Sequence, residues 1–224
     1  MITNEHAQMT DRQQIFDLWR ECFGADEPEF INKFLDSFFT VEDCYVARSE
    51  NGKIAGMLFM LPYRLKNGSQ TLSAAYLYAA ATKPQLRGEG IFTALHEFAK
   101  EELRKEGADC IITVPETKSL YAFYARFGYE PKLLRTVRRA AGRSPEGYGK
   151  YLRGIDKNNY AVVMDKKSFE LTLDGKVFTP DGFVRDGKIY GDDLSETART
   201  EPSGMLLDLS GKCKGTYGLA FLLN

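Results

Sequence analysis

Apolar side chains recur at helical spacing near the start of the chain. They form two groups: Ile15, Leu18, Trp19, Cys22 and Phe23, then Phe30, Ile31, Phe34, Leu35 and Phe38. Residues three and four positions apart share one face of a helix, so this spacing predicts two amphipathic helices. The first helix should begin near Thr10 or Asp11, both suitable N-caps, and end at Gly24.

From residue 43 the pattern changes to that of strands. Three apolar runs are predicted as strands: Asp43–Arg48, Lys53–Arg64 and Thr71–Thr82. Asn-Gly pairs lie between them, and such pairs accept the positive φ angles of a tight hairpin. We therefore expect an antiparallel meander, with Gly56 marking a bulge in its second strand.

Helices and strands alternate in the next part of the chain. The pattern predicts, in order, the helix Gly90–Lys105, the strand Asp109–Val114, the helix Ser119–Phe127 and the strand Tyr129–Val137. This succession predicts an α/β fold with a mixed central sheet flanked by helices.

The composition changes after residue 137. Residues 1–137 are predicted to form one domain, residues 138–149 a linker and residues 150–224 a β-rich extension. The extension contains five short candidate strands: Tyr160–Met164, Phe169–Leu173, Lys176–Phe178, Phe183–Arg185 and Lys188–Tyr190. They could wall off a substrate site, form a homodimer or cover an exposed sheet edge.

Composition excludes several classes of partner. The chain has 224 residues with 30 Lys+Arg and 31 Asp+Glu, and this balance argues against binding nucleic acid or a membrane surface. The four cysteines lie far apart, which favours reduced thiols in a cytoplasmic protein. The polar N-terminus does not resemble a signal peptide. The two histidines, His6 near a flexible terminus and His96 within a helix, indicate no metal site.

One turn carries the candidate chemistry. The apolar strand that ends at Thr82 runs into Gln85–Gly90, and a helix follows at once. This arrangement points backbone N–H groups at one spot on the positive end of a helix dipole. We therefore expect the turn to hold a phosphate-bearing ligand. It is not a Walker A loop, because no Gly-Lys-Ser/Thr follows.

Two motifs resemble those of the GNAT superfamily of N-acetyltransferases. The turn Gln85-Leu86-Arg87-Gly88-Glu89-Gly90 fits the pattern Q/R-x-x-G-x-G/A, and Ser119–Tyr129 is similar to the family's F-Y-x-x-x-G-F/Y helix. The resemblance covers residues 10–137. The attachment of a further unit after these motifs is similar to that in larger bacterial members related to the enhanced-intracellular-survival acetyltransferases, although this chain is shorter than their full form. The resemblance of the two motifs to this superfamily implies a GNAT-like acyl-CoA N-acyltransferase fold with acetyl-CoA as cosubstrate.

The resemblance implies a set of cofactor-binding positions. They are Ala80, Ala81, Thr82, Gln85, Leu86, Arg87, Gly88, Glu89, Gly90, Ile91 and Thr117. Backbone N–H groups of the turn would hold the pyrophosphate, and the three residues from Ala80 would pair with the pantetheine arm. Glycine at positions 88 and 90 would allow close approach of the ligand. Thr117 stands where the family often has Asn.

Tyr124 occupies the family's general-acid position. It would protonate the departing thiolate; the alternative is packing in a helix rich in aromatic residues. No carboxylate lies on the strand where the family often has its base, so Tyr76 or Tyr78 could relay a proton through water. The carboxyl terminus at Asn224 is another candidate base.

The sequence leaves two alternatives for the residues that could bind the acceptor. Asp26, Glu27 and Glu29 could hold a cationic acceptor or simply begin a helix, and the aromatic residues near them could be core or line an acceptor pocket. We interpret the chain as an acyltransferase: a small-molecule or peptide amine attacks acetyl-CoA directly in a ternary complex. The alternatives are a non-catalytic CoA-binding or sensing module and an enzyme that uses a longer acyl-CoA.

Overall fold

The computed structural model describes residues 1–24, 26–139, 160–172, 177–179, 182–185, 188–191 and 199–219. The chain divides into two compact units. The N-terminal unit consists of Met1–Pro62 and Ala75–Gly107, and the C-terminal unit of Tyr63–Ala74 and Ala108–Asn224. The predicted division at residues 138–149 stays a prediction, since residues 140–149 lie outside the described part.

The N-terminal unit is built on the β1-β2-β3-β4 order of strands. Its strands are β1 (Ile2–His6), β2 (Cys44–Ser49), β3 (Ile54–Asn67) and β4 (Gln70–Thr82), of which β3 and β4 continue into the C-terminal unit. Its helices are η1 (Met9–Asp11), α1 (Arg12–Cys22), α2 (Pro28–Phe38), η2 (Pro84–Leu86) and α3 (Ile91–Lys105). The predicted helices and the strand meander are confirmed. The bulge is confirmed too, because Ala47 pairs with Gly56 while Arg48 pairs with Ile54.

Strand β1 was not predicted, and its position corrects the expectation for His6. The segment is polar and has no apolar alternation, but it pairs antiparallel with β2 from Ile2 to His6. The His6 ring lies 4.5 Å from that of Tyr45, and its Nδ1 is 3.1 Å from the Val41 carbonyl oxygen. His6 is therefore part of the sheet and not of a flexible terminus. Strand β1 forms because it pairs with β2, although its own sequence has no strand pattern.

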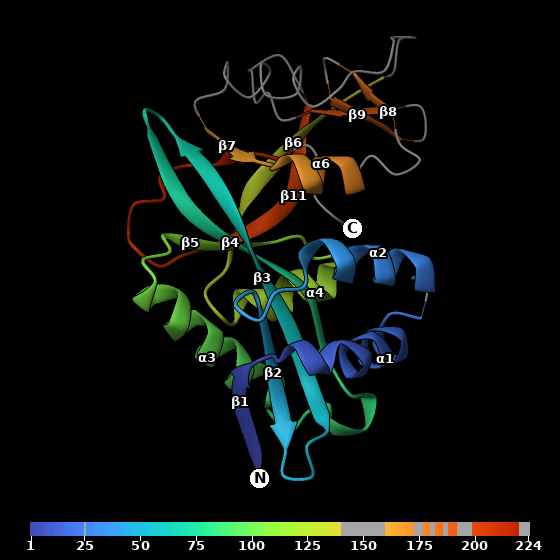
Figure 1. Ribbon diagram of the computed structural model, residues 1–224. Coiled ribbons are helices and arrows are strands. Elements are labelled where there is room, and N and C mark those ends of the chain that lie inside the picture. Colours follow the sequence, from blue (N-terminus) through green and yellow to red (C-terminus); the bar gives the residue numbers. More distant parts are fainter. Residues whose placement is uncertain are drawn as a thin grey trace. The chain divides into compact units, whose positions relative to one another are not determined.

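Helices cover both faces of this part of the sheet (Figure 1). Trp19 of α1 and Phe34 of α2 pack against Phe59 of β3, with ring centroids 6.1 and 5.2 Å from it. Phe98 of α3 instead packs against Tyr45, whose partner across the strands is Leu58, on the opposite face from Phe59. The apolar stripes predicted for α1 and α2 therefore bury against one face, and α3 closes the other.

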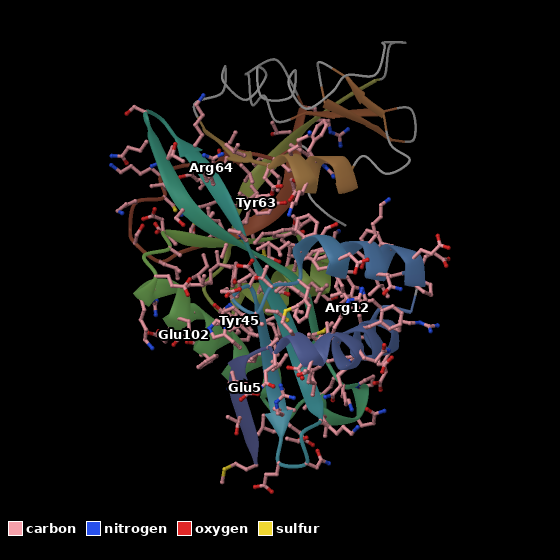
Figure 2. The ribbon with its side chains drawn as sticks, in the orientation of Figure 1. Glu5, Arg12, Tyr45, Tyr63, Arg64 and Glu102 are labelled. Atoms are coloured by element: carbon pink, nitrogen blue, oxygen red, sulfur yellow. The ribbon has the colours of Figure 1, made fainter. Side chains whose placement is uncertain are left out.

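Polar contacts join the two N-terminal helices at their exposed rim. Arg12, labelled in Figure 2, reaches from α1 to α2. Its guanidinium donates to Asn32 Oδ1 at 3.2 Å and to Asp36 Oδ1 at 2.6 Å. Because the Asp36 side chain is largely exposed, this pair orients the helices and adds little stability.

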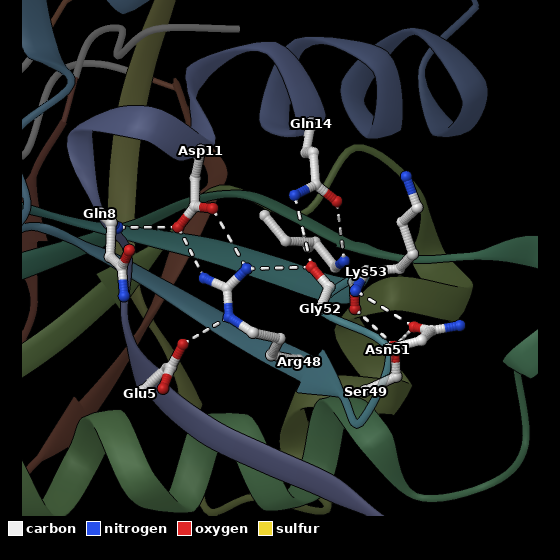
Figure 3. A network of polar contacts seen from close by, with 10 residues as sticks. Glu5, Gln8, Asp11, Gln14, Arg48, Ser49, Asn51, Gly52 and Lys53 are labelled. Atoms are coloured by element: carbon white, nitrogen blue, oxygen red, sulfur yellow. Dashed lines mark hydrogen bonds and ion pairs between the residues drawn. The ribbon is translucent and has the colours of Figure 1, made fainter.

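A buried ion pair fixes the start of α1 to the sheet (Figure 3). Arg48 of β2 donates to both carboxylate oxygens of Asp11, at 3.1 and 2.7 Å, and to Glu5 Oε1 at 2.5 Å. It also donates to the Gly52 carbonyl oxygen at 3.2 Å. One guanidinium thus connects β1, the helix start and the β2–β3 hairpin. Asp11 is the N-cap residue of α1, as predicted, but it makes no side-chain cap hydrogen bond with that helix, and its carboxylate pairs with this arginine.

His96 gives the N-terminal unit an acid-sensitive position. The residue is 0% exposed on α3, and burial lowers its pKa to about 4. The ordinary value is ~6.5, so protonation favours the unfolded chain and stability falls as pH drops from about 6.5 towards 4. By linkage, this residue should cost about 2 kcal/mol of folding stability between pH 7 and pH 5.

Urea unfolding of wild type and His96→Gln at the two pH values tests this expectation. The wild type should lose about 2 kcal/mol more stability than the variant on acidification. An equal loss in both proteins would contradict a neutral, buried histidine.

The C-terminal unit contains the rest of the described elements. They are β5 (Cys110–Thr113), α4 (Lys118–Ala125), β6 (Glu130–Arg139), β7 (Tyr160–Val163), α6 (Lys166–Thr172), β8 (Val177–Thr179), β9 (Gly182–Arg185), β10 (Lys188–Gly191), β11 (Arg199–Asp208) and β12 (Tyr217–Gly218). The strand order is β5-β11-β6-β10-β9-β8, mainly antiparallel. Strand β12 pairs in parallel with β6 and β7, which makes the sheet mixed as predicted.

Two features of this unit differ from the prediction. The predicted strand Phe169–Leu173 is wrong over its described residues, because they belong to helix α6, whose start is held by Asp165. This carboxylate accepts from the Ser168 amide at 3.0 Å and from the Ser168 hydroxyl at 2.7 Å. Strand β11 was not predicted, because Pro202 and Gly204 interrupt it and shift its register against β6. Asn224, whose carboxyl terminus is a candidate base, lies outside the described residues.

Strand β11 runs between β5 and β6 and pairs with both. Residues 199–208 are thus an internal strand of the C-terminal unit rather than a cover on its edge. In the described residues, no helix is long and apolar enough to cross a membrane.

Candidate functional site

The turn between β4 and α3 has the backbone form that a phosphate site requires. Gly88 and Gly90 have φ angles of 88° and 79°, which L side chains rarely adopt. A Cβ at either position would meet no protein atom within 4 Å. Glycine is therefore needed here for its backbone conformation, and the space beside the turn is open to a ligand. Residues 87–90 are all exposed.

Backbone N–H groups at the start of α3 are available for an anion. Gly90 is the N-cap of α3, and as a glycine it has no side chain to cap the helix. Its carbonyl oxygen accepts from the Ala94 amide at 3.0 Å. Among the described residues, the amides of Gly88, Glu89, Gly90 and Ile91 have no hydrogen-bond partner. Unpaired amides at the positive end of a helix dipole are suited to bind a pyrophosphate.

The last turn of α1 supports this turn from the side. Gln85 Nε2 donates to Glu21 Oε1 at 3.1 Å. The Cys22 thiol and Arg87 Nε both donate to the Thr82 carbonyl oxygen, at 3.4 and 3.3 Å. Glu21 and Cys22 were not identified from the sequence, because only the tertiary fold brings the end of α1 to this place.

Cys22 has no sign of an activated nucleophile. Burial raises the pKa of its thiol, and the neighbouring Arg87 opposes this only partly. A cysteine with a raised pKa carries little thiolate at neutral pH. Its observed role is the hydrogen bond to β4.

Strand β4 is distorted immediately before the segment predicted to bind pantetheine. Ala79 has a φ of 46°, and it is the single non-glycine residue with positive φ in the described part of the chain. Such strain often accompanies a functional site. The next three residues, Ala80, Ala81 and Thr82, lead directly into the turn, and Lys83 N donates to the Ala55 carbonyl at 2.9 Å.

Gly56 of β3 lets α3 and β4 approach closely. A Cβ built there would lie 3.0 Å from Ile91 Cγ2 and 3.2 Å from the Ala81 carbonyl oxygen. Ile91 is the first residue of α3, and its side chain is buried. Any larger residue at position 56 would therefore press on the helix end that presents the free amides.

The predicted acid, Tyr124, lies on α4 of the C-terminal unit. Its side chain is 8% exposed and packs against Phe123 and Tyr129, with ring centroids 5.3 and 5.4 Å away. Burial raises its pKa to about 12, although a hydrogen bond with Thr113 partly offsets the effect. The phenol is therefore fully protonated at neutral pH, as a proton donor must be.

Thr117, predicted to contact pantetheine, is the N-cap of α4. Its Oγ1 accepts from the Leu120 amide at 3.3 Å and lies 2.8 Å from the Ser119 hydroxyl. The hydroxyl thus has a structural role at the start of the helix that carries Tyr124. In the part of the chain that the structure describes, no three His, Cys, Asp or Glu side chains are grouped so as to hold a metal ion.

Comparisons with known proteins agree with these features. Residues 4–132 match the family model of the acetyltransferase (GNAT) domain. No curated protein matches the sequence. Similar solved structures include a probable N-acyltransferase of unknown function from Enterococcus faecalis V583, with 14% identity over 94% of this chain and 73% of that one, and a TM-score of 0.68.

Two further structures show the same fold. A GCN5-related N-acetyltransferase from Anabaena variabilis is 17% identical over 95% of this chain, with a TM-score of 0.64, and this chain spans 60% of its length. Eis1 from Mycobacterium abscessus is 15% identical over 83% of this chain and 53% of that chain, with a TM-score of 0.60.

Proposed function

This chain belongs to the GNAT acetyltransferase family, and we propose that it transfers an acetyl group from acetyl-CoA to a primary amine. Acetyl-CoA as the cosubstrate fits the family. The acceptor is a small-molecule or peptide amine.

One observation carries the proposal. The amides of residues 88–91 have no partner among the described residues, and they lie at the N-terminal end of the 15-residue helix α3. Because the turn is exposed, water can satisfy these amides until a ligand replaces it, so no protein group has to be displaced for an anion to bind. A diphosphate, with its two negative charges, suits both the amides and the helix dipole. Arg87 is exposed beside the turn and adds a positive charge.

In the proposed reaction the neutral amine attacks the thioester carbonyl carbon. The carbon–sulfur bond breaks, the amide forms, and the attacking nitrogen loses one proton while the thiolate of CoA gains one. We propose that Tyr124 donates to the departing sulfur. Its raised pKa makes it a weaker acid than an ordinary tyrosine, so its contribution is a hydrogen bond that strengthens as negative charge develops on the sulfur.

Calorimetry with CoA, followed by an amine panel, tests the proposal. Wild type should bind CoA, whereas Gly56→Val, which presses on Ile91 and β4, should bind it at least tenfold more weakly. Gly24→Ala is the matched control, because a Cβ there would make only an ordinary contact 3.8 Å from the Arg20 carbonyl. Equal affinities in all three proteins would contradict the assignment of the turn.

The second step of the test separates an enzyme from a binding module. Release of free thiol from acetyl-CoA in the presence of an amine would support transfer. CoA binding with no thiol release across the panel would instead favour the non-catalytic CoA-binding or sensing module.

A further inference from the structure

A cluster of aromatic rings lies between the two N-terminal helices and the sheet of the N-terminal unit. Tyr78 of β4 contacts both Trp19 and Phe34, with ring centroids 5.8 and 5.1 Å away. Trp19 and Phe34 are buried, at 1% and 0% exposure, whereas Tyr78 is half-buried, as is Phe38, whose ring lies 5.1 Å from that of Phe34. The cluster is thus closed at its base and reaches the surface at its rim.

A carboxylate is fixed beside Trp19 of this cluster. Asp26 Oδ2 accepts from the indole N–H of Trp19 at 2.7 Å, and the Asp26 amide donates to the Phe23 carbonyl at 2.9 Å. Among the described residues, Asp26 Oδ1 has no hydrogen-bond partner. The indole N–H holds one oxygen of the Asp26 carboxylate in place beside aromatic rings. The other oxygen of this carboxylate can accept a hydrogen bond from a ligand.

Tyr78, whose ring contacts the same Trp19 that holds Asp26, adds a neutral hydroxyl. Burial, and to a lesser extent the charge of nearby Asp26, raise the pKa of this phenol, so it stays protonated. Along the chain, Tyr78 directly precedes the strained Ala79 and the segment Ala80–Thr82. A group bound at Tyr78 would therefore lie at the start of the strand proposed to carry the thioester arm.

We propose that Asp26 and Tyr78 recognise the ammonium group of the acceptor, and that the half-buried ring of Tyr78 selects amines with an aromatic or branched apolar body. This inference rests on the proposed function and names the acceptor class of the same enzyme. A carboxylate next to aromatic rings is the combination that recognises organic cations, through a charge-assisted hydrogen bond and ring contacts.

The role given to Asp26 is binding, because carboxylates are far weaker bases than amines. It captures the charged form of the acceptor, which dominates at neutral pH. The bound amine then loses its proton to water before attack. Amines with many hydroxyl groups would leave polar groups unpaired against the rings, so they should be poor acceptors.

Steady-state kinetics with 2-phenylethylamine and ethanolamine as probes test the inference in the full-length protein. Wild type should favour 2-phenylethylamine by at least tenfold in kcat/KM. Asp26→Asn keeps an acceptor for the indole but removes the charge, so it should raise KM for 2-phenylethylamine about tenfold with kcat and CoA affinity nearly unchanged. Asp17→Asn, an exposed position on α1, removes the same charge and should leave KM unchanged.

A second variant keeps the test decisive if Asp26→Asn folds poorly. Tyr78→Phe removes one hydroxyl and should raise KM severalfold while preserving the melting temperature. Thiol release with unchanged KM in these variants, or with no preference between the probes, would overturn this inference alone. Absence of thiol release with every amine would overturn the proposed function and this inference with it.

Discussion

Replacing Tyr124 with phenylalanine should lower the turnover of acetyl transfer by about a hundredfold. The substitution keeps the ring that packs against Phe123 and Tyr129 and removes only the hydroxyl bonded to Thr113. Because that hydroxyl is proposed to interact with the departing sulfur and not with ground-state acetyl-CoA, kcat should fall while KM for acetyl-CoA stays within about threefold. Stopped-flow detection of free thiol measures both parameters.

Tyr121→Phe is the matched control, because it removes a hydroxyl from the same helix at a half-buried position. It should leave kcat within twofold. Unchanged turnover in Tyr124→Phe would remove Tyr124 from the reaction. Equal losses in both variants would indicate disturbed packing of α4.

The pH profile is a second readout of the same assignment. Burial raises the pKa of Tyr124 to about 12, so the phenol stays protonated throughout the range in which amines lose their protons. The wild-type kcat should therefore rise with pH and show no fall between pH 8 and pH 10. A falling limb centred near pH 10 would mean that the acid is a group with an ordinary tyrosine pKa.

The fold could be predicted where a local pattern and the tertiary environment agree. Helices α1, α2 and α3 each carry a regular apolar stripe, and the Asn-Gly turns fix the meander of β2, β3 and β4. Strand β1 has no such pattern and depends on its pairing with β2. Strand β11 contains proline and glycine, yet it forms because β5 and β6 provide hydrogen-bonding edges on both sides.

The candidate site was likewise predictable only where its residues are contiguous in sequence. The phosphate turn could be located because its glycines and the following helix are contiguous in sequence. Glu21, Cys22 and Gly56 support that turn through contacts that only tertiary packing creates. The pairing of Asp26 with Trp19 also depends on the fold, since it requires the chain to turn back against the end of α1.

Loss of the half-buried Arg48, which pairs with the buried Asp11, should be among the most destabilising substitutions in the N-terminal unit. Asp11 is 3% exposed, and its carboxylate accepts from Arg48 at 3.1 and 2.7 Å and from the Gln8 amide at 2.8 Å. Arg48→Met keeps much of the side-chain volume but leaves this carboxylate buried without its counter-charge. Removing one partner of a buried ion pair costs about 4 kcal/mol.

Urea unfolding measures the effect, with Arg104→Met as the control. Arg104 pairs with Glu101 on the exposed face of α3, where both side chains are about half exposed, at 44% and 56%. Losing this exposed ion pair in Arg104→Met should lower the free energy of unfolding by less than about 1 kcal/mol. Because Arg48 also holds Glu5 and the Gly52 carbonyl, its removal should release β1 and the hairpin together. Similar small losses in both variants would show that water reaches Asp11, and that the strand and helix start are held by their backbone pairing alone.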